Sequence, residues 1–313
     1  MKLKLVCIFI FASFWALSCG KNAENPQKSA NPVKDDLGEV VPFNEPPQKI
    51  ISLAPNLTEM IYSLGLGSRL VGNTLYCTYP PEARNVTKVG DMLTIDFEKI
   101  ISLKPDLILI TVEGNAKDSY IKLKNLGLKV FVSNPRNFDG IKKTYSDLGR
   151  IFMKTHQADS SINFWQAQFD SVRQAANRLP HPQALFFVGF NPIMVAGENT
   201  FVNELMTSAG LTNIAGDSPQ NYPVYSREEI LKRNPDYMIM TGTSMSGSFK
   251  KESEMIKNSY PEWKSLNAVR NNDILVVDPD LYLRPGPRFI QALKDLFFKI
   301  HPHPQEAGKY LHP

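Results

Sequence analysis

The sequence has little cysteine and no dense run of charge of either sign. Of three cysteines in 313 residues, Cys7 and Cys19 lie near the N-terminus, which leaves Cys77 alone in the body of the chain. A single thiol cannot form an intramolecular disulfide, so a hydrophobic core must hold the fold, and a chain of this length can supply one. The 35 basic and 31 acidic residues are spread evenly, with a formal charge of +4. The basic patch that nucleic-acid binding requires is therefore missing.

Signatures of common enzymes are missing too. The sequence contains no GxSxG, HExxH or Walker loop. None of the five histidines has a Cys, Asp or Glu at the spacing of a metal site (His156, His181, His301, His303 and His312). Gly65-Leu-Gly67 begins like a dinucleotide fingerprint, but Leu70 stands where the third glycine belongs, and the motif ends a helix capped by Asn56 instead of opening one. We therefore predict a protein that is not an enzyme and has no cofactor or resident metal.

The N-terminus has the parts of an export signal. Two lysines within residues 1–4 precede an apolar run at 5–17, which is shorter than the about 20 residues of a membrane-spanning helix. Ala16-Leu17-Ser18-Cys19-Gly20 then resembles a bacterial lipobox, although Ala16 occupies the position where Leu is usual. We expect a signal peptide at 1–18 and an acylated Cys19 at the mature N-terminus. A plain cleaved signal with an incidental cysteine is the alternative.

The segment after Cys19 has the composition of a linker. Residues 20–47 are rich in Asn, Pro, Lys and Glu and poor in apolar residues, with one short candidate strand near Glu39–Phe43. Such a composition is typical of flexible chain. We expect a tether at 19–47 between the lipid anchor and the folded domains.

Short apolar runs that alternate with helical patterns predict an α/β fold. Three runs with the character of buried parallel strands lie at 49–54, 107–112 and 129–133, and three more lie at 184–189, 237–242 and 274–278. The runs form two groups. We therefore expect two Rossmann-like lobes with central, mostly parallel sheets, at 48–156 and 181–313.

A long helical pattern separates the two groups. Residues 157–179 contain no Pro or Gly, and apolar side chains recur there at steps of three and four. The pattern predicts an amphipathic helix about 35 Å long, assigned to 157–180 and ended by Pro180 and Pro182. A helix of this length suits a rigid connection between two lobes.

The two halves also repeat each other. EKIISLKPDLILI at 98–110 aligns without a gap with EEILKRNPDYMIM at 228–240, and residues 59–66 align with 204–211. The repeat places Glu98 and Glu228 in the first turn of corresponding helices, after the candidate N-caps Asp96 and Ser226. A carboxylate there stabilises its helix through the macrodipole. Two carboxylates at matching points of two lobes also suit docking onto two arginine clusters of a symmetric partner.

The sequence resembles the class III periplasmic binding proteins, and most of all the cobalamin-binding members. The segments that carry the resemblance are 50–83, 97–110, 189–197, 225–236 and 284–289. The resemblance implies two α/β lobes joined by a rigid helix, little hinge closure, and a ligand held between the lobes. It also implies delivery to an ABC permease dimer with its ATPase subunits. Glu98 and Glu228 would dock on arginines of the permease dimer.

The resemblance further implies a set of ligand residues. Tyr76 matches an aromatic that faces the corrinoid, Tyr222 falls where a tryptophan lines the cleft, and Asp280 and Arg284 match polar cleft residues. Met92 and Thr111 replace two other tryptophans. A flat macrocycle needs apolar and aromatic walls with a few polar anchors. The predicted ligand residues are Tyr76, Met92, Phe190, Tyr222, Asp280, Tyr282 and Arg284.

These observations predict a lipoprotein outside the cytoplasmic membrane that captures a corrinoid such as cobalamin for an ABC importer. Haem-binding relatives carry an iron-ligating Tyr where this chain has Asp91, which speaks against haem. Haem and a ferric siderophore remain alternative cargoes. A lipid-anchored tetrapyrrole-modifying lyase is an alternative of another class, disfavoured by the lack of a His/Asp/Glu cluster. Cys77 is expected to be a small buried thiol, with cobalt or iron ligation as its alternative.

Overall fold

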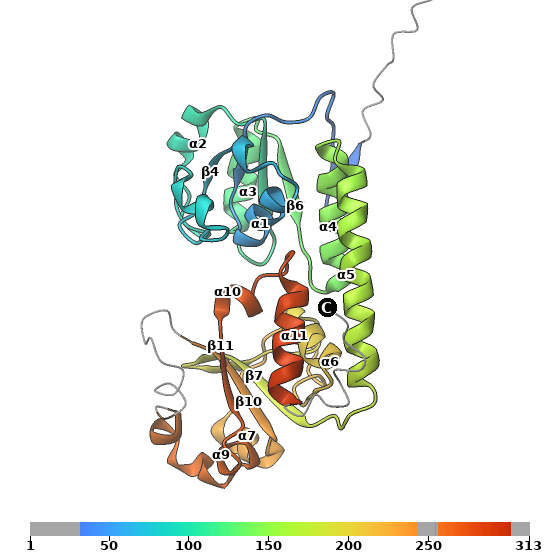
Figure 1. Ribbon diagram of the computed structural model, residues 1–313. Helices are drawn as coiled ribbons and strands as arrows, with labels where there is room; N and C mark the ends of the chain where they lie inside the picture. The colour runs from blue at the N-terminus through green and yellow to red at the C-terminus, as the bar shows by residue number, and fades with distance from the viewer. Residues whose placement is uncertain (1–31, 243–253, 255, 302–313) are drawn as a thin grey trace, which may run out of the picture.

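A computed structural model describes residues 32–242, 254 and 256–301, which form two α/β lobes joined along one side by helices (Figure 1). The predicted fold class is confirmed. The expected signal peptide, Cys19 and the first part of the expected tether lie outside the described residues.

The N-terminal lobe is built on a four-stranded parallel sheet in the order β4-β3-β5-β6. Its strands are β3 (Ile50–Ser52), β4 (Leu70–Asn73), β5 (Leu107–Thr111) and β6 (Val130–Ser133). Its helices are α1 (Pro55–Ser63), η1 (Gly67–Arg69), η2 (Pro81–Asn85), α2 (Phe97–Leu103), α3 (Lys117–Asn125) and α4 (Phe138–Ile151). Every residue of β3, β5 and β6 is buried, as expected for parallel strands covered on both faces.

The C-terminal lobe repeats this plan with one antiparallel addition. Strands β11, β10 and β7 run parallel, β9 pairs parallel with β7, and β8 folds back on β7 as a hairpin. The strands are β7 (Gln183–Phe190), β8 (Ile193–Val195), β9 (Thr212–Asn213), β10 (Tyr237–Thr241) and β11 (Ile274–Val277). The helices are α6 (Phe201–Ser208), α7 (Arg227–Arg233), η3 (Pro261–Ser265), α9 (Asn267–Arg270), α10 (Pro279–Tyr282) and α11 (Phe289–Ile300).

Helix α5 (Thr155–Ala176) runs beside both lobes and packs on α4, α6 and α11 (Figure 1). Its 22 residues make it about 33 Å long at 1.5 Å per residue. It begins two residues before the predicted start and ends before Pro180. Phe138 of α4 stacks on Phe169 of α5 and on Phe289 of α11, with ring centroids 4.5 and 5.3 Å apart. Many buried residues of the two lobes therefore join into one continuous core around this helix.

The structure corrects the predicted tether in its last part. Strands β1 (Val33–Lys34) and β2 (Val40–Val41) pair antiparallel, and Val33, Val41 and Phe43 are buried. The buried Asp35 carboxylate accepts backbone N–H groups from the turn and from Val132 of β6. Apolar side chains and a capped turn thus fold this segment onto the N-terminal lobe, although its overall composition is polar.

The sequence repeat is also a structural repeat. Helices α2 and α7 both end in a left-handed residue, Lys104 and Asn234, with φ of 49° and 43°. A Pro-Asp pair follows each helix. The Asp106 carboxylate accepts the backbone N–H groups of Gln48 and Lys49, both at 2.8 Å, and Asp236 accepts that of Gln183 at 3.0 Å. Asp106 therefore ties the start of β5 to the start of β3, and Asp236 ties the start of β10 to the start of β7.

Candidate functional site

A cavity of about 340 Å³ lies between the lobes, within the size range of small-molecule sites. Its walls come from the loops after β3, β4, β5 and β6 of one lobe, and from the segment after β11 and the stretch between β9 and α7 of the other. Because parallel strands bring their carboxyl ends to one edge of a sheet, loops that are distant in sequence meet there. The lining residues are Pro55, Asn56, Tyr76, Met92, Thr111, Glu113, Gly114, Asn134, Pro135, Tyr222, Pro279, Asp280, Leu283, Arg284 and Pro285.

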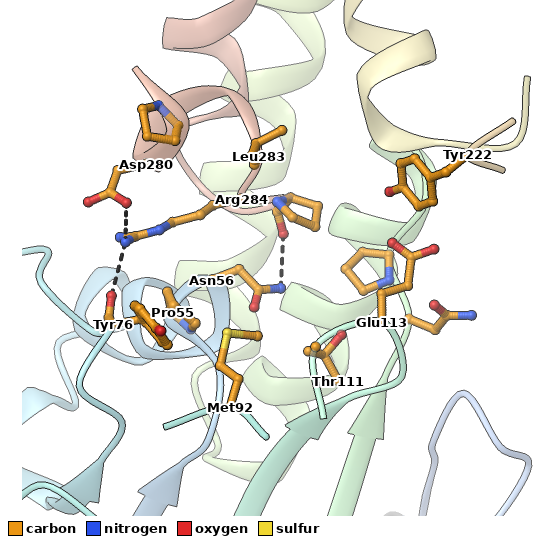
Figure 2. Close-up of a pocket in the computed structure, with 15 residues that line it drawn as sticks. Pro55, Asn56, Tyr76, Met92, Thr111, Glu113, Tyr222, Asp280, Leu283 and Arg284 are labelled. Carbon is orange, nitrogen blue, oxygen red and sulfur yellow. Dashed lines mark hydrogen bonds and ion pairs between the residues drawn. The ribbon is translucent and has the colours of Figure 1, made fainter. Parts of the chain in front are cut away.

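Five of the seven predicted ligand residues line this cleft: Tyr76, Met92, Tyr222, Asp280 and Arg284. Figure 2 shows Tyr76, Asp280 and Arg284 at one end, Tyr222 and Glu113 at the other, and Met92 with Thr111 between them. Tyr76 and Tyr222 are 56% and 40% exposed, so their rings are free to contact a ligand. Whether the five residues bind one remains a prediction.

The other two predicted ligand residues do not line the cleft, which corrects their assignment: Tyr282 lies in the core, and Phe190 is partly buried against the core. Tyr282 is fully buried, and its hydroxyl donates to Asp295 Oδ2 at 2.6 Å. Phe190 stacks on Phe187 with ring centroids 5.3 Å apart and packs against Tyr260 at 6.0 Å. Both rings pack on helices or strands of their own lobe. Sequence alone does not distinguish such an aromatic from one that lines a ligand site.

One end of the cleft is closed by ion pairs between the lobes. Arg288 Nε and Nη2 donate to Glu59 Oε2 and Oε1 at 2.9 and 2.7 Å, and Arg284 Nη1 donates to Glu59 Oε1 at 3.2 Å. Arg284 Nη2 also donates to the Tyr76 carbonyl and to the Asp280 carboxylate. The guanidinium of Arg284 is therefore already engaged by protein groups, although it lines the cleft.

Asn56 does not cap α1, as its position had suggested. The N-cap residue is Ala54, which makes no side-chain hydrogen bond to the helix. Asn56 Nδ2 instead donates to the Pro285 carbonyl of the other lobe at 3.2 Å. This bond adds a second polar link between the lobes beside the cavity.

The opposite end of the cleft is polar and not bridged in this way. Glu113 Oε1 lies 3.5 Å from Arg136 Nε. Burial raises the pKa of Glu113, while the Arg136 charge opposes the rise. Partial burial, together with the Glu113 charge, raises the pKa of Tyr222 to about 12, so the phenol is protonated at neutral pH. Figure 2 shows Glu113 and Tyr222 approaching each other from opposite lobes.

Met92 and Thr111 form the floor of the cleft where tryptophans were implied by the resemblance. A Cβ added to Gly114 would lie 2.0 Å from Met92 Cε, so Met92 packs directly on the glycine backbone. A long flexible thioether fills irregular space and adapts to a ligand surface. No sequence pattern pointed to Glu113, Gly114 or Asn134, because loops after strands carry no local signal of what they face.

Cys77 is fully buried, which confirms the interpretation as a small buried thiol. Its sulfur lies 3.1 Å from the hydroxyl of Thr58 and 3.2 Å from that of Thr74. Cys77 does not line the cleft, although the neighbouring Tyr76 does.

Glu98 and Glu228 lie in the first turns of α2 and α7, as predicted, and both are exposed. Asp96 and Ser226 cap these helices. Hydrogen bonds from its own backbone N–H and from Ser226 lower the pKa of Glu228. Among the described residues neither carboxylate forms an ion pair, whereas the adjacent Glu229 pairs with Arg233. Figure 1 shows α2 and α7 on different lobes, on the side away from α5.

No described helix has both the length and the apolar character to cross a membrane. Within the same part of the chain, no group of three or more His, Cys, Asp or Glu side chains is arranged to hold a metal ion.

Two parallel-sheet lobes that face one cleft and share a long helix define the fold of a two-lobed binding protein. The chain belongs to the periplasmic binding protein family, whose model matches residues 50–281. It is 30% identical over 308 residues to an uncharacterized ABC transporter substrate-binding lipoprotein, YvrC, of Bacillus subtilis (strain 168), covering 94% of this chain and 95% of YvrC.

Two further comparisons involve vitamin B12-binding proteins. The one from Pectobacterium atrosepticum is 30% identical over 256 residues, covering 80% of this chain and 87% of the relative. The crystal structure of the periplasmic vitamin B12 binding protein BtuF of Vibrio cholerae matches with a TM-score of 0.72 at 26% identity. That match covers 83% of this chain and 99% of BtuF.

Proposed function

We propose that this chain is the substrate-binding component of an ABC importer, exported and held outside the cytoplasmic membrane by a lipid on Cys19. The lipobox-like segment and the near full-length match to a substrate-binding lipoprotein support this assignment. In this role the protein retains its ligand without changing it and passes it to the permease dimer with its ATPase subunits.

The proposed cargo is a corrinoid such as cobalamin. The observation that carries this proposal is the cleft itself, with exposed Tyr76 and Tyr222 rings at its two ends, Met92 on its floor and the Asp280 carboxylate on its wall. Aromatic and apolar walls with a few polar groups suit a flat macrocycle with a polar periphery. The similarity to vitamin B12-binding proteins favours the same cargo.

Haem is the nearest alternative, because a haem-binding protein shares this fold. The Asp91 side chain, which stands where the resemblance implies an iron-ligating Tyr, accepts the backbone N–H groups of Leu93 and Thr94 at 2.8 and 2.6 Å. Asp91 therefore shapes its own loop. A ferric siderophore is a further alternative, for which the cleft offers no specific feature.

The structure suggests how such a protein would work. The continuous core around α5 and the Glu59–Arg288 pair hold the lobes at a fixed separation, so the ligand enters a preformed cleft. Preformed sites lose less free energy to ordering on binding. The exposed Glu98 and Glu228 carboxylates would then meet arginines of the permease, one from each half of a symmetric partner.

Calorimetric titration of the purified protein tests the cargo. We expect cobalamin or cobinamide to bind one to one with a Kd of about 1 μM or tighter, which corresponds to about −8 kcal/mol. Tight binding of haem with no heat from either corrinoid would exclude the proposed cargo and leave the importer role intact. Native mass spectrometry of protein purified from its own host would identify the bound molecule directly.

A further inference from the structure

The described residues that line the cleft carry two carboxylates and one cation. The carboxylates are Glu113 and Asp280, and the cation is Arg284. Arg284 already donates to Glu59, Asp280 and the Tyr76 carbonyl. Its charge is thus balanced within the protein. A ligand carboxylate entering this cleft would meet two carboxylates and, among the described lining residues, a cation that is already paired.

The Glu113 end is the part of the cleft with unused hydrogen-bonding capacity. Arg136, which is not itself a lining residue, forms an ion pair with Glu113 at 3.5 Å between Nε and Oε1, and this nitrogen makes no hydrogen bond. Asn134 Oδ1, on the same wall, is likewise buried without a hydrogen-bond partner. Arg136 thus holds the Glu113 carboxylate electrostatically while the lone pairs of the carboxylate remain available. Unmet acceptors in a cleft favour a ligand that brings donors.

We infer that Glu113 is a specificity-determining residue that accepts hydrogen bonds from primary carboxamides on the ligand periphery and rejects ligands with carboxylates there. This inference rests on the proposed function and names the ligand chemistry of the same cleft. A carboxamide offers two N–H donors, and a bond to an ionised acceptor is stronger than a neutral one. A carboxylate at the same place would juxtapose like charges in a partly desolvated site. The Tyr222 hydroxyl, on the opposite lobe, is placed to donate to the carboxamide oxygen.

Two corrins with the same ring and cobalt test this inference. Dicyanocobinamide presents carboxamides, and dicyanocobyrinic acid presents free carboxylates at the same ring positions. Each is titrated at neutral pH and constant ionic strength into the wild type, Glu113→Gln and Glu39→Gln. Glu39 is exposed in the turn between β1 and β2. Its replacement removes the same charge from the same lobe and leaves the cleft lining unchanged.

In the wild type we expect dicyanocobinamide to bind at least about 100-fold more tightly than the carboxylate corrin. Glu113→Gln should lower this ratio by about tenfold, through weaker binding of dicyanocobinamide and tighter binding of the carboxylate corrin, and Glu39→Gln should leave it within about twofold. An unchanged ratio in Glu113→Gln overturns the inference and leaves the corrinoid cargo standing. Failure of the wild type to bind either corrin removes the cargo proposal and the inference together.

Discussion

Glu59 and Arg288 lie 229 residues apart in sequence and form a two-point ion pair between the lobes, with N–O distances of 2.9 and 2.7 Å. Glu59 is only 3% exposed, and the Tyr79 ring covers the Arg288 guanidinium at 4.2 Å. Planar two-point pairing of this kind fixes both distance and orientation. The pair therefore sets the geometry of the cleft at the end where Arg284 and Asp280 also meet.

Removing one partner of this pair should destabilise the protein. Glu59→Gln removes the buried carboxylate and leaves the partly buried Arg288 charge without its counter-charge, a change that costs about 3–5 kcal/mol. Urea denaturation would measure it. Glu262→Gln, which breaks the exposed pair with Arg227, is the control and should cost less than about 1 kcal/mol. Equal stability of the two variants would show that the interlobe pair does not fix the lobes.

The aromatic ends of the cleft should contribute to ligand affinity. Tyr76→Ala and Tyr222→Ala should each weaken corrinoid binding by about 1–3 kcal/mol if the rings pack on the macrocycle. Phe164→Ala removes an aromatic that is 63% exposed on α5 and outside the cleft, so it should leave affinity unchanged. Titration calorimetry compares the three variants. Full affinity in both tyrosine variants would show that neither ring packs on the ligand.

Sequence patterns predicted the strands that have a clear signal in their own local sequence. Continuous apolar runs predicted β3, β5 and β6 in one lobe and β7, β10 and β11 in the other. The strands missed are short or interrupted: β4 contains Gly72, and β9 has two residues. Such strands form by pairing with the edge of a neighbouring strand, so tertiary pairing and not local sequence decides whether they form.

The site was predictable only where the family resemblance reached it. It led to Tyr76, Met92, Tyr222, Asp280 and Arg284 in the cleft, but not to the ion pair of Glu59 with Arg288. Those two residues lie in different lobes, and no spacing rule connects them.

Binding of a neutral corrinoid should weaken in mild acid because of Glu113. Burial holds the pKa of Glu113 above its ordinary value of 4.5, with Arg136 opposing the shift. Protonation therefore begins at a pH at which ordinary carboxylates are still ionised. Affinity that depends on the carboxylate is present above the raised pKa and is lost as the pH falls through it. Dicyanocobinamide titrations from neutral pH downward should show this decline in the wild type and not in Glu113→Gln; parallel curves would contradict it.

The anchor should depend on one sulfur. Cys19→Ser removes the thiol that lipidation requires, so the processed protein should move from the membrane fraction to the soluble fraction. Immunoblots of the two fractions measure this, with Cys77→Ser as the control because its buried thiol has no part in anchoring. A variant that stays with the membrane would point to another means of retention.

Loss of both docking carboxylates should abolish transport without affecting ligand binding. As helix-start residues alone, Glu98 and Glu228 stabilise their helices slightly through the macrodipole, and replacing them would leave uptake alone. As docking groups, each loses about 2–5 kcal/mol of association when its arginine partner is left unpaired. We therefore expect Glu98→Gln with Glu228→Gln to stop uptake into vesicles that contain the reconstituted permease, while ligand affinity and Tm stay almost unchanged.

The matched control for this experiment replaces two other exposed carboxylates, one in each lobe. Asp118 lies in the first turn of α3, and Glu198 lies between β8 and α6. Asp118→Asn with Glu198→Gln removes the same net charge, so it should leave uptake intact if position matters and not charge alone. Reversal of Glu98 and Glu228 to Arg should abolish uptake as well, because like charges would then meet across the interface. Normal uptake by the Gln double variant would leave both residues with the helix-start role alone.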